Sequence, residues 1–277
     1  MSTATLITGD AATALDGVPD RSCAAVVTSP PYYRLRKYTD DPREIGRDGT
    51  VGRYLPALVE TFAMARQKLI PGGVLFVNIG DTYNAYNRNR GRGGELSARR
   101  DDARSVQDHP GLLDPGSPNK SLLGVPERLA AHMIGDGWVL RASITWARPT
   151  LPERVTDRPR RASERLLMFA ERPRNVARRP ATRPDLWTDI WALPSASGSS
   201  QHPARFAPAL PEACLSWVAD TDGAVLDPFS GSGATGIAAA TAGRDYYGID
   251  LSGESTALAA AALAPHFSTI TTQEAPQ

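Results

Sequence analysis

Two short motifs, separated by most of the chain, hold the residues best suited to chemistry. Residues 28–32 read TSPPY and follow an apolar run at residues 23–27, and residues 227–233 read DPFSGSG and follow another at residues 224–226. Short apolar runs bounded by turn residues predict buried strands. Both motifs are therefore expected at the edge of an open α/β sheet, where functional groups and ligands gather.

The second motif has the features of a binding site for a ligand that contains ribose. Gly231 and Gly233 let the backbone approach a ligand closely, and the helix expected after them directs its N-terminus into the site. Asp250 follows Gly231 by nineteen residues, at the end of the next expected strand, where an acidic side chain can bind ribose hydroxyls. Together with Gly236 the glycines spell GxGxxG, so a nicotinamide-dependent dehydrogenase is an alternative. Only one expected strand follows this motif, which leaves no room for a dinucleotide-binding half.

In this order the two motifs resemble the catalytic and cofactor motifs of the amino-methylating DNA methyltransferases, in the β class that places the catalytic motif first. The similarity continues in residues 137–158 and 202–208. It implies a seven-stranded Rossmann-like fold that uses S-adenosylmethionine, is circularly permuted and carries helices on both faces of its sheet. By the same resemblance Asp227 approaches the methionine part of the cofactor, Phe229 packs beside it and Asp250 binds ribose. The expected cofactor-binding residues are Asp10, Phe206, Asp227, Pro228, Phe229, Gly231, Ser232, Gly233 and Asp250.

The first motif suits methyl transfer to an exocyclic base amine. The lone pair of such an amine is delocalised into the base, so catalysis must reduce that delocalisation while aiming the nitrogen at the methyl group. The Ser29 hydroxyl and the Pro30 carbonyl can accept the two amino hydrogens, and Pro30 and Pro31 make the turn stiff. Tyr32 supplies a flat face for a base flipped out of the duplex. The amine can attack first and lose its proton afterwards, so no strong base is required.

The apolar pattern predicts one domain over residues 1–277, with seven strands and six helical segments. The strands are expected at Ala4–Thr8, Ala24–Thr28, Val74–Ile79, Trp138–Trp146, Arg165–Ala170, Ala224–Leu226 and Tyr246–Ile249. Helices are expected from Asp10 to Leu15, Tyr54 to Leu69, Pro126 to Ile134, Pro208 to Ala219, Gly233 to Ala242 and Glu254 to Leu263. Asp10 is also a candidate helix N-cap. Residues 84–120 lose all periodicity and are expected to form a flexible insertion that reads the target sequence or is merely solvated.

Composition narrows the class of protein further. A chain of 277 residues with 41% apolar residues can bury one full core, and no apolar run is long enough for a membrane span or a signal peptide. A cytoplasmic location without membrane contact is expected. The two cysteines, Cys23 and Cys214, provide no disulfide framework, no Cys/His cluster has metal-ligand spacing, and neither cysteine follows proline as a cytosine-C5 nucleophile would.

Positive charge is concentrated in one part of a chain whose net charge is only +1. Residues 141–184 contain twelve Arg against four Asp or Glu, which predicts a DNA-facing segment, although an Arg-rich composition is also typical of GC-rich genomes. The expected phosphate contacts are Arg148, Arg154, Arg158, Arg160 and Arg161. Thr150 and Arg154 stand where the resembled family usually has Asn and Ser.

Three functions are compatible with these residues. Ser29 is more typical of the cytosine-N4 branch of the resembled family, so an N4-specific DNA methyltransferase is favoured and an adenine-N6 enzyme is the alternative. A module that binds DNA or cofactor without turnover is the third, because Thr150 and Arg154 depart from the family pattern. The implied partners are double-stranded DNA and a cognate restriction endonuclease, and the protein is expected to be a monomer or a homodimer. RNA presents the same amine and stays open as a substrate.

Overall fold

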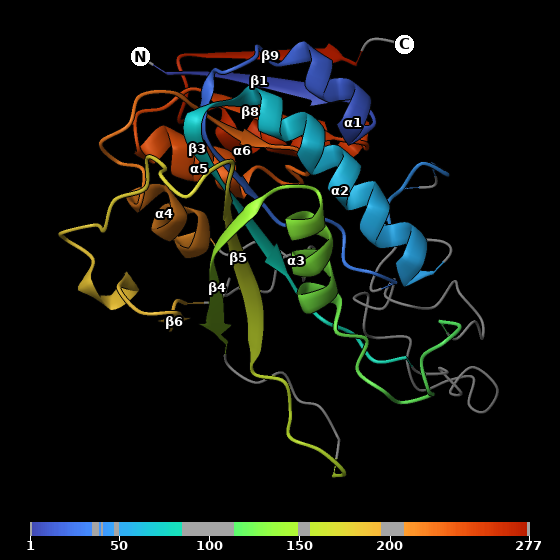
Figure 1. The fold of residues 1–277 in the computed structure, drawn as a ribbon. Helices are drawn as coiled ribbons and strands as arrows, with labels where there is room; N and C mark the ends of the chain where they lie inside the picture. The colour runs from blue at the N-terminus through green and yellow to red at the C-terminus, as the bar shows by residue number, and fades with distance from the viewer. Residues whose placement is uncertain are drawn as a thin grey trace.

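A mixed sheet lies at the centre of the computed structural model (Figure 1). The structure describes residues 2–34, 39, 41–46, 50–84, 114–148, 156–194 and 208–275. Within these residues nine strands are ordered β6-β4-β5-β3-β2-β7-β8-β1-β9. Their bounds are β1 Thr3–Thr8, β2 Cys23–Thr28, β3 Leu69–Ile79, β4 Val139–Ala147, β5 Ser163–Ala170, β6 Ile190–Trp191, β7 Ala224–Asp227, β8 Tyr246–Asp250 and β9 Thr269–Glu274.

Helices cover both faces of the sheet, as expected. One face packs against α1 (Ala11–Ala14), α2 (Val51–Lys68) and α3 (Val125–Gly135), and the other packs against α4 (Ala209–Ser216), α5 (Ala234–Thr241) and α6 (Gly253–Leu263). Strand side chains alternate between the two resulting cores. In β3, Leu75 and Val77 enter the core under α2, whereas Val74 and Phe76 enter the core under α4.

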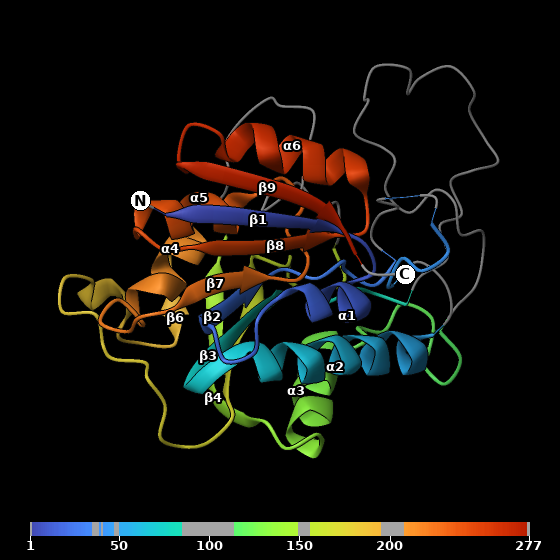
Figure 2. The same cartoon turned by 90° about the horizontal axis from the view of Figure 1, so that it is seen from above.

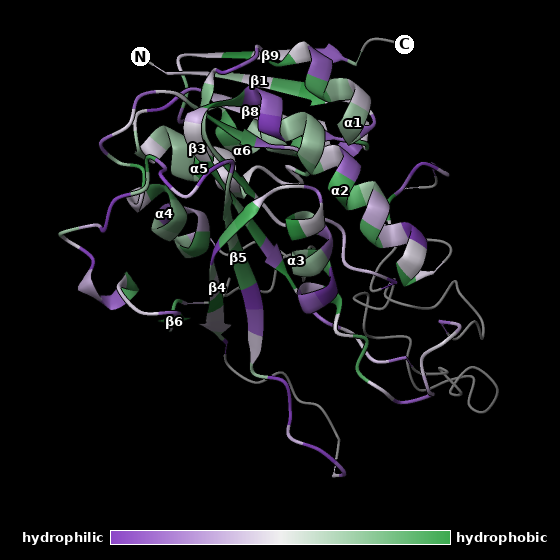
Figure 3. Cartoon of the chain, viewed as in Figure 1, coloured by the Kyte–Doolittle hydropathy of each residue, from purple (hydrophilic) through white to green (hydrophobic). Residues whose placement is uncertain are grey.

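The long helix α2 shows why the sequence pattern identifies these elements. Its buried residues recur three or four positions apart, and Figure 3 shows apolar and polar residues alternating along it. The buried positions are Val51, Tyr54, Leu55, Leu58, Thr61, Phe62, Ala65 and Lys68. The apolar side of α2 therefore lies against the sheet.

Strand directions place the ends of eight of the nine described strands at one edge of the sheet, and only β5 ends at the other. Strands β3, β2, β7, β8, β1 and β9 run parallel, whereas β5 runs antiparallel to β3 and β4. Figure 2 shows the arrowheads of β1, β8 and β9 pointing the same way. We call the side where β1, β2, β3, β7 and β8 end the carboxyl edge and the opposite side the amino edge.

The chain reverses its winding direction between β2 and β7. After β2 it continues to α2 on one face of the sheet, and after β7 it continues to α5 on the other face. In open α/β sheets ligands bind beside the carboxyl ends of the strands at such a switch point. The N-terminal strand β1 lies between β8 and β9, both from the C-terminal part of the chain, in agreement with the permuted order that was expected.

All seven expected strands are present, and the structure adds β6 and β9. The strand β9 is an exposed edge strand of Thr, Gln and Glu with one apolar residue, so it lacks the alternation that predicts a strand. The strand β6 has only two residues. The strand β3 begins at Leu69, earlier than expected, because the chain pairs with β2 on both sides of an irregularity at residues 70–73.

Candidate active site

The two sequence motifs meet at the carboxyl edge, at the switch point between β2 and β7. Val26 and Leu226 are paired in the sheet, and Thr28 and Asp227, the last residues of β2 and β7, are joined through their side chains. The Thr28 hydroxyl donates a 2.6 Å hydrogen bond to Asp227 Oδ1. Residues 199 positions apart are thereby held in contact, and the turn that begins at Ser29 lies next to the turn that begins at Pro228.

Asp227 carries a buried carboxyl group at the end of β7. Its side chain accepts from the Thr28 hydroxyl and, at 3.0 Å, from the Phe229 amide, and the residue is 2% exposed. Burial raises its pKa from 3.8 to about 6, hydrogen bonds with the side chains of Thr28 and Thr235 and with the Phe229 amide lower it, and the nearby carboxyl of Asp250 raises it. A buried carboxylate in this position is suited to a ligand that brings a positive charge.

Asp250 ends the neighbouring strand β8 and fixes the glycine turn. Its Oδ2 accepts from the Gly231 amide and its Oδ1 from the Ser252 amide, both at 2.9 Å. Burial is the main cause that raises the pKa of this carboxyl as well. Each carboxylate oxygen has two lone pairs, so both oxygens keep the capacity to accept from ligand hydroxyls.

The glycine turn brings backbone close to the space beside these carboxyls. Gly231 has φ +50°, and a Cβ placed there would have no other atom within 4 Å, so this part of the turn borders open space. Gly233 has φ +86° and forms the N-cap of α5, where a Cβ would lie 3.3 Å from the Ala259 Cβ. Phe229 packs edge-on against Phe62, with ring centres 6.4 Å apart. Pro228 is buried, and Ser232 is partly exposed.

Asp10 lies at the same edge, where it caps α1. Its Oδ1 accepts from the amides of Ala12 at 3.1 Å and Thr13 at 3.4 Å, which is the N-cap role that the sequence left open. Its expected contact with the adenosyl part of the cofactor stays a prediction. Phe206 and Arg154, two other expected site residues, lie outside the described residues.

The turn at residues 29–32 presents two hydrogen-bond acceptors. Pro30 is buried and Ser29 is partly exposed, and in the described part of the chain no hydrogen bond engages the Ser29 hydroxyl or the Pro30 carbonyl. The next carbonyl, that of Pro31, accepts from the Tyr54 hydroxyl at 2.8 Å. Tyr54 also packs against Tyr33, with ring centres 5.4 Å apart. Helix α2 therefore holds the turn in place through the hydrogen bond from Tyr54 to the Pro31 carbonyl.

Tyr32 is held by polar groups from two neighbouring strands. Its hydroxyl donates to Glu164 Oε2 on β5 at 2.7 Å and accepts from Asn78 Nδ2 on β3 at 2.8 Å. Glu164 also forms an ion pair with Arg148, which lies just after β4. Sequence reasoning missed Asn78 and Glu164, although a polar residue inside the apolar run VLFVNI at residues 74–79 is a usable signal.

The expected phosphate contacts divide into two groups. Arg148 is engaged by Glu164 and stacks on Trp146, with its guanidinium carbon 4.9 Å from the ring centre. Arg158 and Arg161 instead flank the ring of Tyr83, at 4.0 and 5.5 Å from its centre. Arg160 is exposed. These four arginines lie near the carboxyl edge, because β4 ends and β5 begins there.

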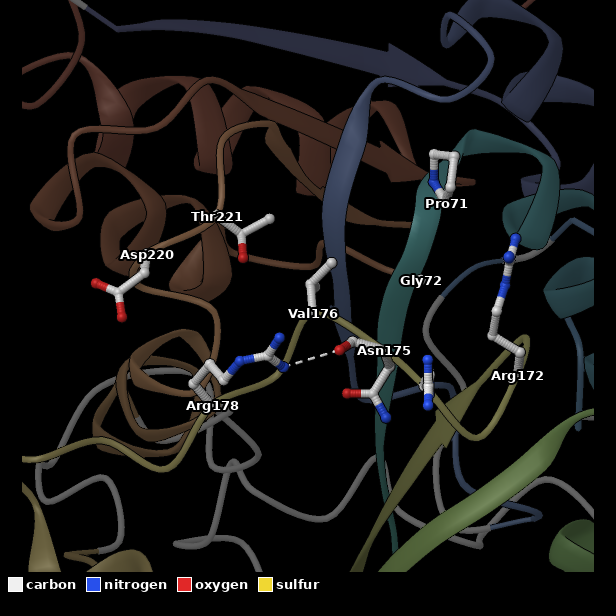
Figure 4. Close-up of a pocket in the computed structure, with 9 residues that line it drawn as sticks. Pro71, Gly72, Arg172, Asn175, Val176, Arg178, Asp220 and Thr221 are labelled. Carbon is white, nitrogen blue, oxygen red and sulfur yellow. Dashed lines mark hydrogen bonds between the residues drawn. The ribbon is translucent and has the colours of Figure 1, made fainter.

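The rest of the basic segment lies at the opposite edge of the sheet. Strand β5 runs antiparallel to β3, so the residues after Ala170 emerge at the amino edge. A cavity of about 590 Å³ opens there (Figure 4). It is lined by Pro71, Gly72, Arg172, Arg174, Asn175, Val176, Arg178, Asp220 and Thr221. The segment 141–184 is therefore split between two ends of the molecule, and only its middle part, around the connection between β4 and β5, lies near the paired motifs.

The two described ends of the expected insertion at residues 84–120 are tied together beside the turn. Asn84 Nδ2 donates to the Ser117 carbonyl at 2.6 Å, and the Asp114 amide donates to Asn84 Oδ1 at 2.8 Å. Asp114 Oδ2 in turn accepts from the Tyr33 hydroxyl at 3.1 Å and the Val51 amide at 2.6 Å. Residues 85–113, which include most of the expected loop, lie outside the described residues.

Two further observations concern ligands and membranes. Across the described ranges, no group of three or more His, Cys, Asp or Glu side chains is arranged to hold a metal ion. In the same ranges, no helix has the length and apolar character needed to cross a membrane.

Comparison with known families agrees with this arrangement of motifs. A family model described as DNA methylase, for enzymes of the N6 and N4 type, matches residues 23–261. The chain therefore belongs to the amino-methylating DNA methyltransferases, which confirms the resemblance of its two motifs. It is 37% identical over 264 residues to the type II methyltransferase M.XycI of Xanthomonas campestris pv. cyanopsidis, an alignment that covers 92% of this chain and 86% of that protein.

A second relative gives the same family, and solved structures give the same fold. The type II methyltransferase M.SmaI of Serratia marcescens is 33% identical, with 92% of this chain and 88% of that protein covered. A DNA modification methylase of Thermus thermophilus, solved with S-adenosyl-L-methionine, has a TM-score of 0.67 at 21% identity and complete coverage of both chains. PvuII DNA methyltransferase, described as cytosine-N4-specific, has a TM-score of 0.69 at 18% identity, with 98% and 95% covered. The fold is that of a Rossmann-like methyltransferase.

Proposed function

We propose that this protein transfers the methyl group of S-adenosylmethionine to the exocyclic N4 of cytosine in DNA. The observation that carries the proposal is the hydrogen bond between Thr28 and Asp227, because it holds the catalytic turn and the cofactor strand side by side at the switch point. The choice of cytosine N4 rests on Ser29, the first residue of the turn. Adenine N6 is the second candidate, since both bases present an amine to the same acceptors.

The residues at the carboxyl edge fit S-adenosylmethionine. The buried Asp227 carboxylate suits the ammonium group of its methionine part, and Asp250 keeps lone pairs for ribose hydroxyls. Gly231 lets the ligand approach the backbone, and Phe229 offers an apolar surface beside it. When bound, this cofactor supplies a methyl group activated by its sulfonium.

The turn at residues 29–32 would orient the accepting amine. The Ser29 hydroxyl and the Pro30 carbonyl accept the two amino hydrogens, which draws the nitrogen lone pair out of conjugation and toward the methyl group. Tyr32 stacks on the flipped base. The nitrogen–carbon bond forms as the sulfur–carbon bond breaks, and the amine then loses a proton to water, so no strong base is needed.

DNA would approach the carboxyl edge across the connection between β4 and β5. Arg158, Arg160 and Arg161 are the proposed phosphate contacts there, and Arg154 is proposed with them on sequence grounds. We propose residues 84–120 as the target-reading segment, because both of its described ends are tied beside Tyr33. A cognate restriction endonuclease is the proposed partner, because the relatives are type II methyltransferases. We also propose that the protein acts on double-stranded DNA in the cytoplasm, as a monomer or a homodimer.

Nucleoside mass spectrometry of DNA from a host that lacks its own methyltransferases and expresses this chain tests the proposal. We expect N4-methylcytosine in the DNA of the expressing host and much less of it with the Ser29→Ala variant. N6-methyladenine in its place would select the second candidate. A purified protein that binds S-adenosylmethionine but leaves DNA unmodified would indicate a binding module.

A further inference from the structure

Tyr32 is connected to residues that are far from it in sequence and that the methyl-transfer chemistry does not use directly. Glu164 Oε2 accepts from the Tyr32 hydroxyl at 2.7 Å and from Asn78 Nδ2 at 2.9 Å, and Asn78 Nδ2 also donates to the Tyr32 hydroxyl at 2.8 Å. The three polar groups thus contact one another at the ends of adjacent strands. The Glu164 side chain is only 14% exposed.

The other carboxylate oxygen of Glu164 is held by Arg148. The two side chains form an ion pair through Oε1, and the guanidinium lies over Trp146, whose ring is buried. Glu164 therefore meets donors on both of its oxygens, which matches the acceptor-only character of an ionised carboxylate. Held in this way, Glu164 has little freedom to move away from Tyr32.

The ring of Tyr32 is restricted on the side of Gly80 as well. A Cβ at Gly80 would lie 2.7 Å from Cε2 of the Tyr32 ring, so only glycine permits the observed approach. Backbone contact at the ring edge and hydrogen bonds at the hydroxyl together determine the plane of the ring. A partly exposed tyrosine on a turn would otherwise be free to rotate about its side-chain bonds.

We propose that Glu164 is a positioning residue for Tyr32, acting together with Asn78 and supported by Arg148. The inference rests on the proposed function, in which the Tyr32 ring stacks on the flipped base. Stacking depends on how the ring is placed against the base. The hydrogen bond to Glu164 fixes the hydroxyl end and therefore the direction of the ring axis, and the close approach of Gly80 limits rotation of the ring about that axis. Arg148 contributes to methyl transfer through Glu164, which is a different role from a phosphate contact.

The test is a double-mutant cycle on Tyr32→Phe and Glu164→Leu, measured as single-turnover methyl transfer at saturating DNA and S-adenosylmethionine. Tyr32→Phe keeps the ring and removes the hydroxyl, and Glu164→Leu removes the acceptor. We expect each variant to slow the rate about tenfold. Because both act on one interaction, the double variant is expected to be no more than about twofold slower than the slower single variant.

If Glu164→Leu folds poorly, the variant Glu164→Gln and the control Glu60→Gln still test the role of Glu164. Glu164→Gln retains an oxygen that can accept from Tyr32, so most of the rate should return, about threefold below the parent. The control Glu60→Gln makes the same change on the exposed surface of α2 and should leave the rate unchanged. S-adenosylmethionine affinity should be equal in all variants, because Glu164 lies outside the cofactor residues.

The outcomes separate this inference from the proposed function. A parent protein without methyl transfer overturns both. An active parent overturns the inference alone if the losses of Tyr32→Phe and Glu164→Leu multiply in the double variant, or if Tyr32→Phe is as fast as the parent. Failure of Glu164→Gln to recover more rate than Glu164→Leu in a folded protein would also contradict it.

Discussion

The charge state of the buried Asp227 carboxyl affects both ligand binding and the free energy of unfolding. Burial raises its pKa to about 6, above the ordinary 3.8. Its contribution to the free energy of unfolding is fully present below the unfolded pKa and is lost as pH rises through about 6. The carboxylate is therefore maintained at neutral pH at a cost in stability, as is common where a protein binds a charged ligand.

The variant Asp227→Asn should be more stable than the parent and should bind S-adenosylmethionine more weakly. The amide oxygen can still accept from Thr28 and Phe229, but the charge is gone. At pH 8 we expect the free energy of unfolding to rise by at most about 3 kcal/mol, and at pH 4 to change little. Urea unfolding at both pH values measures this, and the exposed residue Asp222, changed to Asn, is the control.

The same ionisation predicts how cofactor affinity depends on pH. Protonation of Asp227 removes its attraction for a cationic ligand group, so the affinity of the parent for S-adenosylmethionine should fall as pH is lowered from 8 to 5. Asp227→Asn should bind weakly at every pH. A parent affinity that calorimetry finds constant over this range would remove Asp227 from the cofactor site.

Asp250→Ala should weaken S-adenosylmethionine binding without unfolding the protein. The variant loses the proposed ribose contact and also releases the amides of Gly231 and Ser252. We expect affinity to drop at least tenfold, corresponding to about 1.5–3 kcal/mol for hydrogen bonds to a charged group. Calorimetric titration gives the affinity, with Asp222→Ala as the control. Equal affinities for the two variants would refute the ribose assignment.

Among the elements, the ones with a strong apolar period could be predicted from the sequence. The helix α2 has a helical apolar period and the central expected strands are short continuous apolar runs, so the two motifs could be placed at the strand ends that follow these runs. The strand β9 could not be predicted, because its residues are mostly polar and show no apolar alternation. Only its backbone pairing with β1 makes it a strand. Asn78 and Glu164 were missed because only the sheet order brings β3 and β5 together beside Tyr32.

Deletion of most of the insertion at residues 84–120 tests whether this segment reads DNA. Asp114 must be kept, since it accepts from Tyr33 and Val51, so the deletion should span residues 88–112 and be bridged by a short Gly–Ser linker. If this segment reads DNA, the deletion variant should keep its melting temperature and cofactor affinity but lose methylation or its site preference. Long-read sequencing of methylated DNA gives the sites. Unchanged sites and rate would place recognition elsewhere.

Across the whole molecule, the Arg-rich segment is divided between opposite edges of the sheet. The exposed Arg160 precedes β5 near the carboxyl edge, whereas the exposed Arg174 lines the cavity at the amino edge. Charge counting along the chain could not separate these groups, because the β4–β5 hairpin returns the chain across the sheet. Only the group near the paired motifs is expected to neutralise DNA phosphates during methylation.

Replacement of single arginines at the two edges tests this division. Arg160→Ala should weaken DNA binding and reduce the slope of log affinity against log salt by about 1, since one phosphate contact is lost. Arg174→Ala removes the same charge at the amino edge and should leave both quantities unchanged. Fluorescence anisotropy over a range of salt concentrations measures them. Equal effects of the two variants would indicate non-specific attraction.

Transfer of a labelled methyl group to DNA shows which atom this protein methylates. Purified parent protein is incubated with duplex DNA and S-adenosylmethionine that carries a deuterated methyl group, and the nucleosides are analysed by mass spectrometry. We predict the label on the exocyclic nitrogen of cytosine, with a rate about 100-fold lower in Ser29→Ala at a cofactor affinity within about twofold of the parent. Label on the exocyclic nitrogen of adenine or on carbon 5 of cytosine, or equal rates for Ser29→Ala and the parent, would contradict the proposed transfer to cytosine N4.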